Sequence, residues 1–276
     1  MKKRTILRYV ALGAIAALAA TLLPHRSGEE TPAPLSRDYD AIAQEGILRV
    51  TTEYNPINFY ANGDETSGFQ YELVQAFARD HGLQATFLPE MSLEKQMGGL
   101  AKGEYDLIAG LLATSQLKDT LLLSGATTFN KQVLVQREPS SIDDSTYVKS
   151  LLELAGKTLH VAKGSPSILR IHNLAGEIGD TIFIQEVEKY GQEQLVAMVA
   201  HGDIDYAVCD ESIAQSLTDS LPQIDIHTPI SFTQFYAWGV SKHSPALFDS
   251  INGWLQQFKQ GKEYKQLYRK YYSLGR

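Results

Sequence analysis

The stretches that decide the fold are residues 97–110, MGGLAKGEYDLIAG, and residues 195–210, LVAMVAHGDIDYAVCD, about a hundred residues further along the chain. Each stretch has the pattern of an amphipathic helix that ends at a glycine, followed by a short turn, an aspartate and an apolar run. Gly103 and Gly202 suit the left-handed conformation in which many helices end. The apolar runs are typical of strands buried on both faces of a parallel sheet. The repeat therefore predicts two similar α/β lobes, with ligand-binding residues beyond the carboxyl ends of the strands.

The sequence on either side of the repeats completes the expected elements. Apolar runs bounded by turn residues predict strands, and apolar residues at helical spacing predict helices. Strands are expected at residues 46–52, 83–88, 107–111, 131–137, 158–162, 181–187, 206–209 and 235–240, and helices at residues 71–81, 93–102, 165–174, 192–201, 245–259 and 263–272. The polar residues 138–144 are expected to cross between the lobes. The first lobe is then predicted to comprise residues 45–137 plus 235–276, and the second lobe residues 138–234.

Composition limits the classes of function. The 276 residues carry a net charge of −7, and no long run of Lys and Arg follows the N-terminal segment, which argues against a nucleic-acid surface. The histidines are scattered and Cys209 is the only cysteine, so the sequence predicts neither an intramolecular disulfide nor a metal site. We therefore expect a protein without metal or cofactor, whose partner is a small molecule.

The N-terminus has the pattern of an export signal. Four Lys and Arg residues within the first eight positions precede an apolar stretch over residues 9–23. This stretch is shorter than the roughly 20 residues that span a bilayer comfortably, and it fits a secretory signal. Residues 1–25 are expected to be either a cleaved signal peptide or a signal anchor, and residues 26–44 a flexible spacer. Both alternatives predict a periplasmic protein, held at the inner membrane if the leader is uncleaved.

Several motifs together resemble the family 3 extracellular solute-binding proteins. They are LRVTT at residues 48–52, GFQYEL at 68–73, GEYDLIAG at 103–110, GDIDYAV at 202–208 and GKEY at 261–264. The resemblance covers roughly residues 45–273. It implies an α/β fold of the type II periplasmic-binding-protein kind: two Rossmann-like lobes joined by two crossing strands, with a cleft in which hinge closure traps a small molecule.

The chain also resembles the N-terminal binding module of the membrane-bound lytic transglycosylase F group, notably at residues 109–111. The catalytic half of that group would follow the last helix, and we expect no such half here. This second resemblance implies a regulatory role rather than transport.

The first-lobe residues of the implied site lie after two strands. Tyr54 and Phe59 follow the first strand, where the family places an aromatic floor for the ligand. The alternative for Phe59 is a place in the core. Gly110, Leu112 and Thr114 lie at the end of the third strand, where the resemblance implies ligand contacts, although Thr114 could equally cap the next helix.

One position departs from the family pattern. Amino-acid binders of the family have a hydroxyl residue two positions after the glycine at 110, and an Arg five positions further that binds the ligand carboxylate. Those positions are Leu112 and Leu117 here, and the neighbouring Lys118 should point about 100° away on a helix. The resemblance therefore implies a more apolar pocket that does not hold a free α-amino acid in the usual pose.

The second lobe is closer to the family pattern. Lys163 and Ser165 lie between a predicted strand and helix, where backbone amides suit an anion, or where Ser165 could simply be the N-cap. Asp210 lies where the family binds a ligand ammonium, or it could cap the helix that follows.

These features predict non-catalytic capture of a small polar solute, such as one derived from an amino acid or a peptide, for an ABC permease. The alternative is a membrane-tethered regulatory or sensor module that binds peptidoglycan fragments or peptides and whose partner is a cell-wall enzyme. A less favoured alternative is a dehydratase-like enzyme, in which Glu53 and Asp210 would perform acid–base chemistry.

Overall fold

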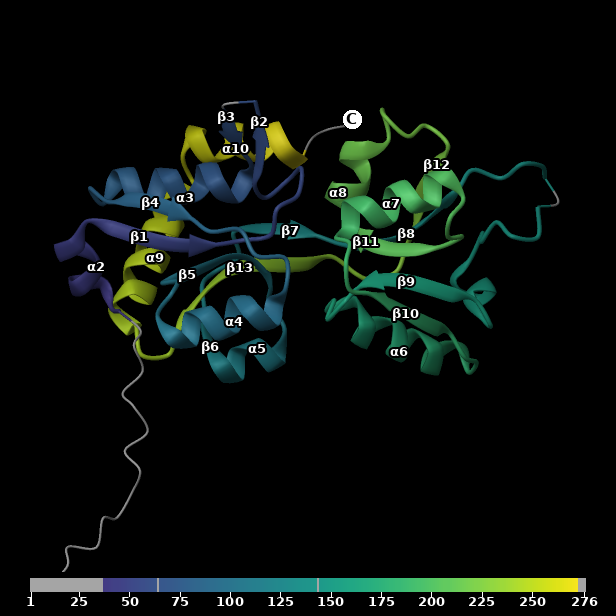
Figure 1. Ribbon diagram of the computed structural model, residues 1–276, viewed down its shortest axis with the longest axis horizontal. Coiled ribbons are helices and arrows are strands. Elements are labelled where there is room, and N and C mark those ends of the chain that lie inside the picture. The colour runs from purple at the N-terminus through teal and green to yellow at the C-terminus, as the bar shows by residue number, and fades with distance from the viewer. Residues whose placement is uncertain (1–36, 64, 143, 273–276) are drawn as a thin grey trace, which may run out of the picture. The chain divides into compact units, whose positions relative to one another are not determined.

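Two mixed sheets with the same strand order form the frame of the protein (Figure 1). The computed structural model describes residues 37–63, 65–142 and 144–272. The first sheet has the order β4-β1-β5-β13-β6, and its strands are β1 (Ile47–Thr51), β4 (Gln84–Phe87), β5 (Leu107–Leu112), β6 (Leu121–Leu123) and β13 (Gln234–Ser241). A further strand, β7 (Thr128–Asn130), also pairs with β13. β1 runs parallel to β4 and β5, whereas β13 is antiparallel to β5.

The second sheet repeats this plan. Its order is β10-β9-β11-β8-β12, with β8 (Gln132–Arg137), β9 (Thr158–Ala162), β10 (Phe183–Val187), β11 (Ala207–Asp210) and β12 (Ile224–Pro229). β9 is parallel to β10 and β11, and β8 is antiparallel to β11. Each sheet therefore has three parallel strands followed by one antiparallel strand that comes from a distant part of the chain. This is the type II periplasmic-binding-protein fold, with two α/β lobes.

Helices cover both faces of each sheet. In the first lobe, α3 (Phe69–Asp80), α9 (Pro245–Phe258) and α10 (Lys262–Tyr272) share one core, and α4 (Leu93–Lys102) and α5 (Ser115–Thr120) pack on the other face. In the second lobe, α7 (Gln192–His201) and α8 (Glu211–Leu217) cover one face and α6 (Ser167–Ile178) the other. The remaining elements are α2 (Tyr39–Glu45), the hairpin β2 (Tyr60–Asn62) and β3 (Glu65–Ser67), and the 3₁₀ helix η1 (Leu151–Leu154).

The repeated stretches occupy equivalent places in the two lobes. They form α4 with β5 and α7 with β11, and the predicted bounds of both helices agree with the structure. Gly103 and Gly202 end these helices with φ of 73° and 83°. The aspartates that follow each bind an arginine: Asp106 accepts from Arg37, and Asp205 accepts from Arg137 at 2.6 Å.

The predicted crossing at residues 138–144 is wrong. β8 already belongs to the second sheet, whereas β7 still pairs with β13 of the first, so the chain crosses near Lys131. The boundary between the lobes therefore lies near Lys131 and not at the predicted residue 137. The apolar run of β8 is buried along most of its length and would suit either sheet, so its composition carried no information about which lobe it joins. The chain returns between Pro229 and Gln234, close to the predicted position.

The expected spacer, residues 26–44, is also wrong in its last part. α2 begins at Tyr39, and the Asp38 carboxylate accepts hydrogen bonds of 2.8 Å both from the Tyr39 amide and from the Leu247 amide in the first turn of α9. Ile42 of α2 is fully buried in the first-lobe core. The predicted leader, residues 1–25, and the spacer up to residue 36 lie outside the described residues.

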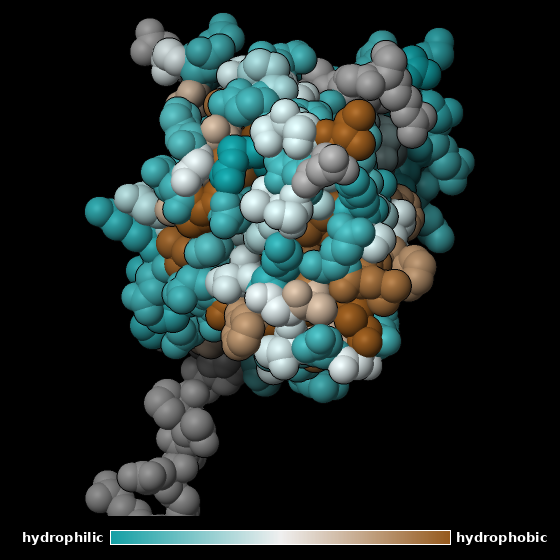
Figure 2. Space-filling view, turned by 90° about the vertical axis from the view of Figure 1, so that its right-hand side faces the viewer, coloured by the Kyte–Doolittle hydropathy of each residue, from teal (hydrophilic) through white to brown (hydrophobic). Residues whose placement is uncertain are grey.

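The described surface is mainly polar. Figure 2, which views the end of the second lobe, shows a largely hydrophilic face interrupted by hydrophobic patches. Phe183, at the edge strand β10, is 55% exposed. Within the described ranges, no helix combines the length and the apolar character needed to cross a bilayer.

Candidate ligand-binding site

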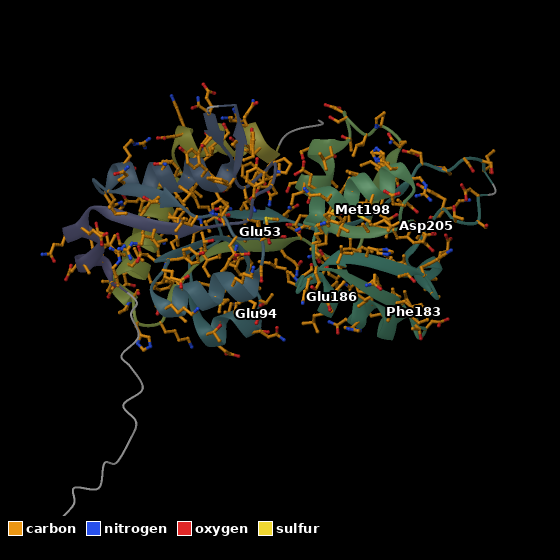
Figure 3. All side chains as sticks on the ribbon, viewed as in Figure 1. Glu53, Glu94, Phe183, Glu186, Met198 and Asp205 are labelled. Atoms are coloured by element: carbon orange, nitrogen blue, oxygen red, sulfur yellow. The ribbon has the colours of Figure 1, made fainter. Side chains whose placement is uncertain are left out.

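Glu53 follows β1 directly and lies on the side of the first lobe toward the second (Figure 3). The preceding Thr52 hydroxyl donates a 2.9 Å hydrogen bond to the Ala109 carbonyl of β5, which ties the two strand ends together. The nearest side-chain donor to Glu53 is the Asn55 amide, at 3.5 Å. Burial, together with the charge of Asp210, raises the pKa of Glu53 to about 7. Glu53 is therefore a half-buried carboxylate with little hydrogen-bond compensation.

Asp210 ends β11 in the second lobe and is 9% exposed. It occupies the N-cap position of α8, yet its side chain makes no capping hydrogen bond. Its Oδ1 instead accepts a 2.6 Å hydrogen bond from the Tyr236 hydroxyl, and its backbone amide donates to Gln192 Oε1 at 2.6 Å. Burial raises the pKa of Asp210 to about 6, although the hydrogen bond from Tyr236 and the neighbouring Gln192 side chain oppose the shift. Of the two predicted roles for this residue, the capping role is not used.

Tyr236 connects the two lobes at this point. It belongs to β13 of the first sheet, opposite Leu112 on β5, and its ring is buried. Burial and the charge of Asp210 raise the pKa of the Tyr236 hydroxyl well above its usual value, so this group acts as a donor. Tyr272, in the last turn of α10, also has a raised pKa because of burial and the charge of Asp210. Asp210 is therefore hydrogen-bonded to one phenol group of the first lobe, and its charge acts on a second.

The predicted aromatic residues after β1 form a cluster. The Phe59 ring stacks on Phe87 at 5.4 Å, meets Tyr71 edge-on at 5.8 Å and meets Tyr54 edge-on at 6.1 Å. Tyr54 is 44% exposed, so its ring has free surface for a ligand. Phe59 is half-buried and packs mainly against first-lobe aromatics.

The residues after β5 take mainly structural roles. Gly110 has a φ of 83° and lies against Gln70, whose Cγ would be 3.1 Å from a side-chain Cβ at that position. Leu112 is buried beside Tyr236. Thr114 is the N-cap of α5 and accepts a hydrogen bond from the Leu117 amide at 3.3 Å.

The position predicted to lack a carboxylate-binding Arg is apolar in the structure as well. Leu117 packs into a cluster with Leu100, Leu111 and Leu121. Lys118 lies 5.8 Å from the Phe235 ring and lines a separate surface groove, so it does not replace the missing cation.

The polar groups of the loop between β9 and α6 already have partners within the second lobe. Ser165 Oγ lies 2.7 Å from Ser167 Oγ, and α6 begins at Ser167 rather than at Ser165. Lys163 pairs with Glu188. The Gly164 amide donates a 2.8 Å hydrogen bond to Glu186.

The structure thus binds Asp210 to Tyr236, which lies opposite Leu112, and it places Glu53 within reach of the charge of Asp210. Thr114 and Ser165 have local partners. Sequence reasoning missed Tyr236 and Gln192. Tyr236 was inside a predicted strand, but its partner depends on a register between segments far apart in the chain. Gln192 opens a predicted helix, where its reach back to the Asp210 amide leaves no local signal.

Comparisons with known proteins agree with this architecture. The chain is 27% identical over 242 residues to the membrane-bound lytic murein transglycosylase F of Photobacterium profundum, covering 85% of this chain and 45% of that protein. The chain spans about half the length of the curated relatives it matches. Among solved structures, an ancestral arginine-binding protein bound to arginine has a TM-score of 0.71 and 25% identity, covering 82% of this chain and 98% of that one. The substrate-binding protein of an amino acid ABC transporter has a TM-score of 0.71 and 18% identity, covering 82% and 99%.

The family model described as bacterial extracellular solute-binding proteins, family 3, matches residues 47–274, which include both sheets and all the site residues. The chain therefore belongs to the family 3 bacterial extracellular solute-binding proteins.

Proposed function

We propose that this protein captures a small solute that carries an amino or other cationic group, and that it does so in the periplasm without catalysis. The observation that carries the proposal is the position of Asp210, a buried carboxylate with one oxygen held by Tyr236. A second carboxylate, Glu53, lies near enough that the charge of Asp210 raises the pKa of Glu53. Two carboxylates in a partly dry site repel each other. A bound ammonium or guanidinium group would relieve this repulsion and would be attracted more strongly than in bulk water.

The remaining predicted site residues would complete the binding surface. Tyr54 offers an exposed aromatic face, and Phe59 would support the Tyr54 ring through their edge-on contact. Leu112 adds apolar surface next to Tyr236, and Gly110 keeps the end of β5 open. Lys163, Ser165 and Thr114 would border the ligand from neighbouring strand ends.

Capture would proceed by movement of the two lobes about the connections near residues 131 and 230–233. A closed form stabilised by ligand is what a partner can recognise, since a ligand shifts the equilibrium only by its differential affinity for the two forms. An ABC permease is the proposed partner, in keeping with the solute-binding family and with the transport role named for one structural neighbour.

A second candidate is a regulatory or sensor module for a cell-wall enzyme, tethered to the inner membrane and binding peptidoglycan fragments or peptides. The relatives named lytic murein transglycosylase F favour it, because this chain matches about half of their length. Peptidoglycan peptides also carry amino groups, so the same acidic site would serve either role.

Thermal denaturation of the full chain with a panel of solutes tests the proposal. The panel contains basic amino acids, simple amines, muropeptides and organic acids without amino groups. A ligand present at about 100 times its Kd should add roughly 2.7 kcal/mol to the free energy of unfolding. Stabilisation by amino-bearing solutes supports the proposal, and stabilisation by muropeptides alone supports the second candidate.

The variant Asp210→Asn should lose the stabilisation by ligand. Asp219→Asn, an exposed change of the same chemistry in the same lobe, should keep it. Stabilisation confined to organic acids, or an Asp210→Asn protein that responds like the wild type, would rule the proposal out.

A further inference from the structure

We infer that this site selects cations that carry no free carboxylate, such as diamines, guanidino amines or amino-acid amides. The inference rests on the proposed function and narrows the class of ligand. It follows from the balance of charges and hydrogen-bond groups around Asp210.

The site has two carboxylates, and the lysines next to its strand ends are engaged elsewhere. Lys131, at the crossing between the lobes, binds Glu211 at 2.9 Å. Lys163, after β9, pairs with Glu188. Lys118, after β5, lies against the Phe235 ring. An amino acid would bring a carboxylate that none of these lysines is free to neutralise, and an uncompensated buried charge is strongly disfavoured.

The backbone position most suited to an anion is already filled. Backbone amides at the start of a helix attract carboxylates, but the Gly164 amide ahead of α6 binds the Glu186 carboxylate at 2.8 Å. Lys163 beside it also feels the charges of Glu188, Glu186 and Glu94, the last from α4 of the first lobe. Figure 3 labels Glu94 and Glu186, which come from different lobes. A ligand carboxylate in this region would meet the protein's own carboxylates.

A buried acceptor next to Asp210 has no donor among the described residues. Gln132 lies opposite Asp210 in the β8–β11 register, so the two side chains share one face of the sheet. Its Oε1 is buried and has no partner among the described residues. Gln234 Oε1, two residues before Tyr236 on β13, is likewise buried and unpaired within the part of the chain that the structure describes. These two acceptors suit N–H groups of a ligand.

Calorimetric titration of the full chain with matched ligand pairs tests the inference. Arginine is compared with agmatine and argininamide, and lysine with cadaverine and lysinamide, since each pair differs only at the carboxylate. The carboxylate-free members should bind at least about tenfold more tightly. Arginine or lysine binding as tightly as its carboxylate-free counterpart would overturn the inference while leaving the proposed function in place. Failure of every cation to bind would overturn both.

The variant Glu186→Gln provides a second test that does not change Asp210. It should weaken the competition for the Gly164 amide and reduce the preference for agmatine over arginine by roughly threefold or more. Glu138→Gln, an exposed change in the same lobe, should leave this preference unchanged. A preference that is the same in Glu186→Gln as in the wild type, with both proteins folded by circular dichroism, would contradict the role given to Glu186.

Discussion

The Tyr236 hydroxyl, on β13 of the first sheet, donates a 2.6 Å hydrogen bond to Oδ1 of Asp210, at the end of β11 in the second sheet. The two residues are 26 positions apart in the chain and belong to different lobes. The bond holds one carboxylate oxygen of Asp210 in place. It also opposes the rise in the pKa of Asp210 that burial causes, because the hydrogen bond stabilises the charged carboxylate.

Replacing Tyr236 with Phe should weaken both stability and binding. The variant loses a buried hydrogen bond to a charged group, so the free energy of unfolding should fall by about 1.5–3 kcal/mol in urea denaturation. The pKa of Asp210 should rise further, which carboxyl NMR titration would detect, and affinity for cations at pH 7 should fall. Tyr190→Phe, at an exposed ring of the second lobe, serves as the control. An unchanged Asp210 titration would contradict the importance of this bond.

Stability should fall as the pH rises from about 5 to about 7.5. The pKa values of Glu53 and Asp210 are raised to about 7 and about 6, so the folded protein holds these protons more tightly than the unfolded chain does. Between the unfolded and folded pKa values the folded state binds more protons, and raising the pH then disfavours it. The two groups together should lower the free energy of unfolding by roughly 3–4 kcal/mol across this range.

Urea denaturation at several pH values measures this effect. The double variant Glu53→Gln/Asp210→Asn should remove most of the fall that wild type shows between pH 5 and 7.5. His227 has a pKa raised by its hydrogen bond with Asp225, so it contributes a loss in the same direction that the double variant retains. Identical pH profiles for wild type and double variant would show that these carboxyls are not perturbed.

The equivalent aspartates of the two repeats should differ in their importance. Asp106 has a fully buried side chain and accepts hydrogen bonds from Arg37 Nε at 3.0 Å and from the Arg49 amide at 2.8 Å. Asp205 pairs with Arg137, but its side chain is 63% exposed. Asp106→Asn should cost about 3 kcal/mol because it removes a buried charged partner of Arg37, whereas Asp205→Asn should cost less than about 1 kcal/mol. Equal losses in chemical denaturation would refute this assignment.

Asp38 should contribute more to stability than its place near the end of the expected spacer suggests. Its carboxylate caps α2 and also accepts from the first turn of α9, at the amides of Leu247 and Ala246. Asp38→Ala should therefore lower the free energy of unfolding by about 2 kcal/mol. Asp40→Ala, an exposed position in the first turn of α2, should change it by less than about 0.5 kcal/mol. Thermal denaturation of the two variants side by side makes the comparison.

Much of the fold could be predicted because its repeating units are local. The α4–β5 and α7–β11 units carry their helix ends, turns and buried strands within about twenty residues each, and their predicted bounds agree with the structure to within one residue. The short strands β6, β7 and β12 escaped prediction, since they form by pairing with distant strands rather than by local pattern. The assignment of β8 to the wrong lobe has the same cause.

The site residues show the same difference between local patterns and contacts between distant parts of the chain. Asp210 and Tyr54 follow predicted strands directly, so their place at the strand ends was accessible from the sequence. The hydrogen bond from the Gly164 amide to Glu186 and the bond between Tyr236 and Asp210 join residues that are 22 and 26 positions apart. Such distances fall outside any helix or turn pattern, and only the tertiary structure brings these groups together.

The position of the crossing near Lys131 makes the second sheet one uninterrupted stretch of chain, from β8 to β12, inserted between β7 and β13 of the first. During synthesis from the N-terminus, the inserted half would be fully made while its neighbour still lacks the central strand β13 and the helices α9 and α10. The half made second can therefore close its core before the half that was begun first. In nascent chains stopped after β12, protease protection should extend over the inserted half and not over β1, β4 and β5.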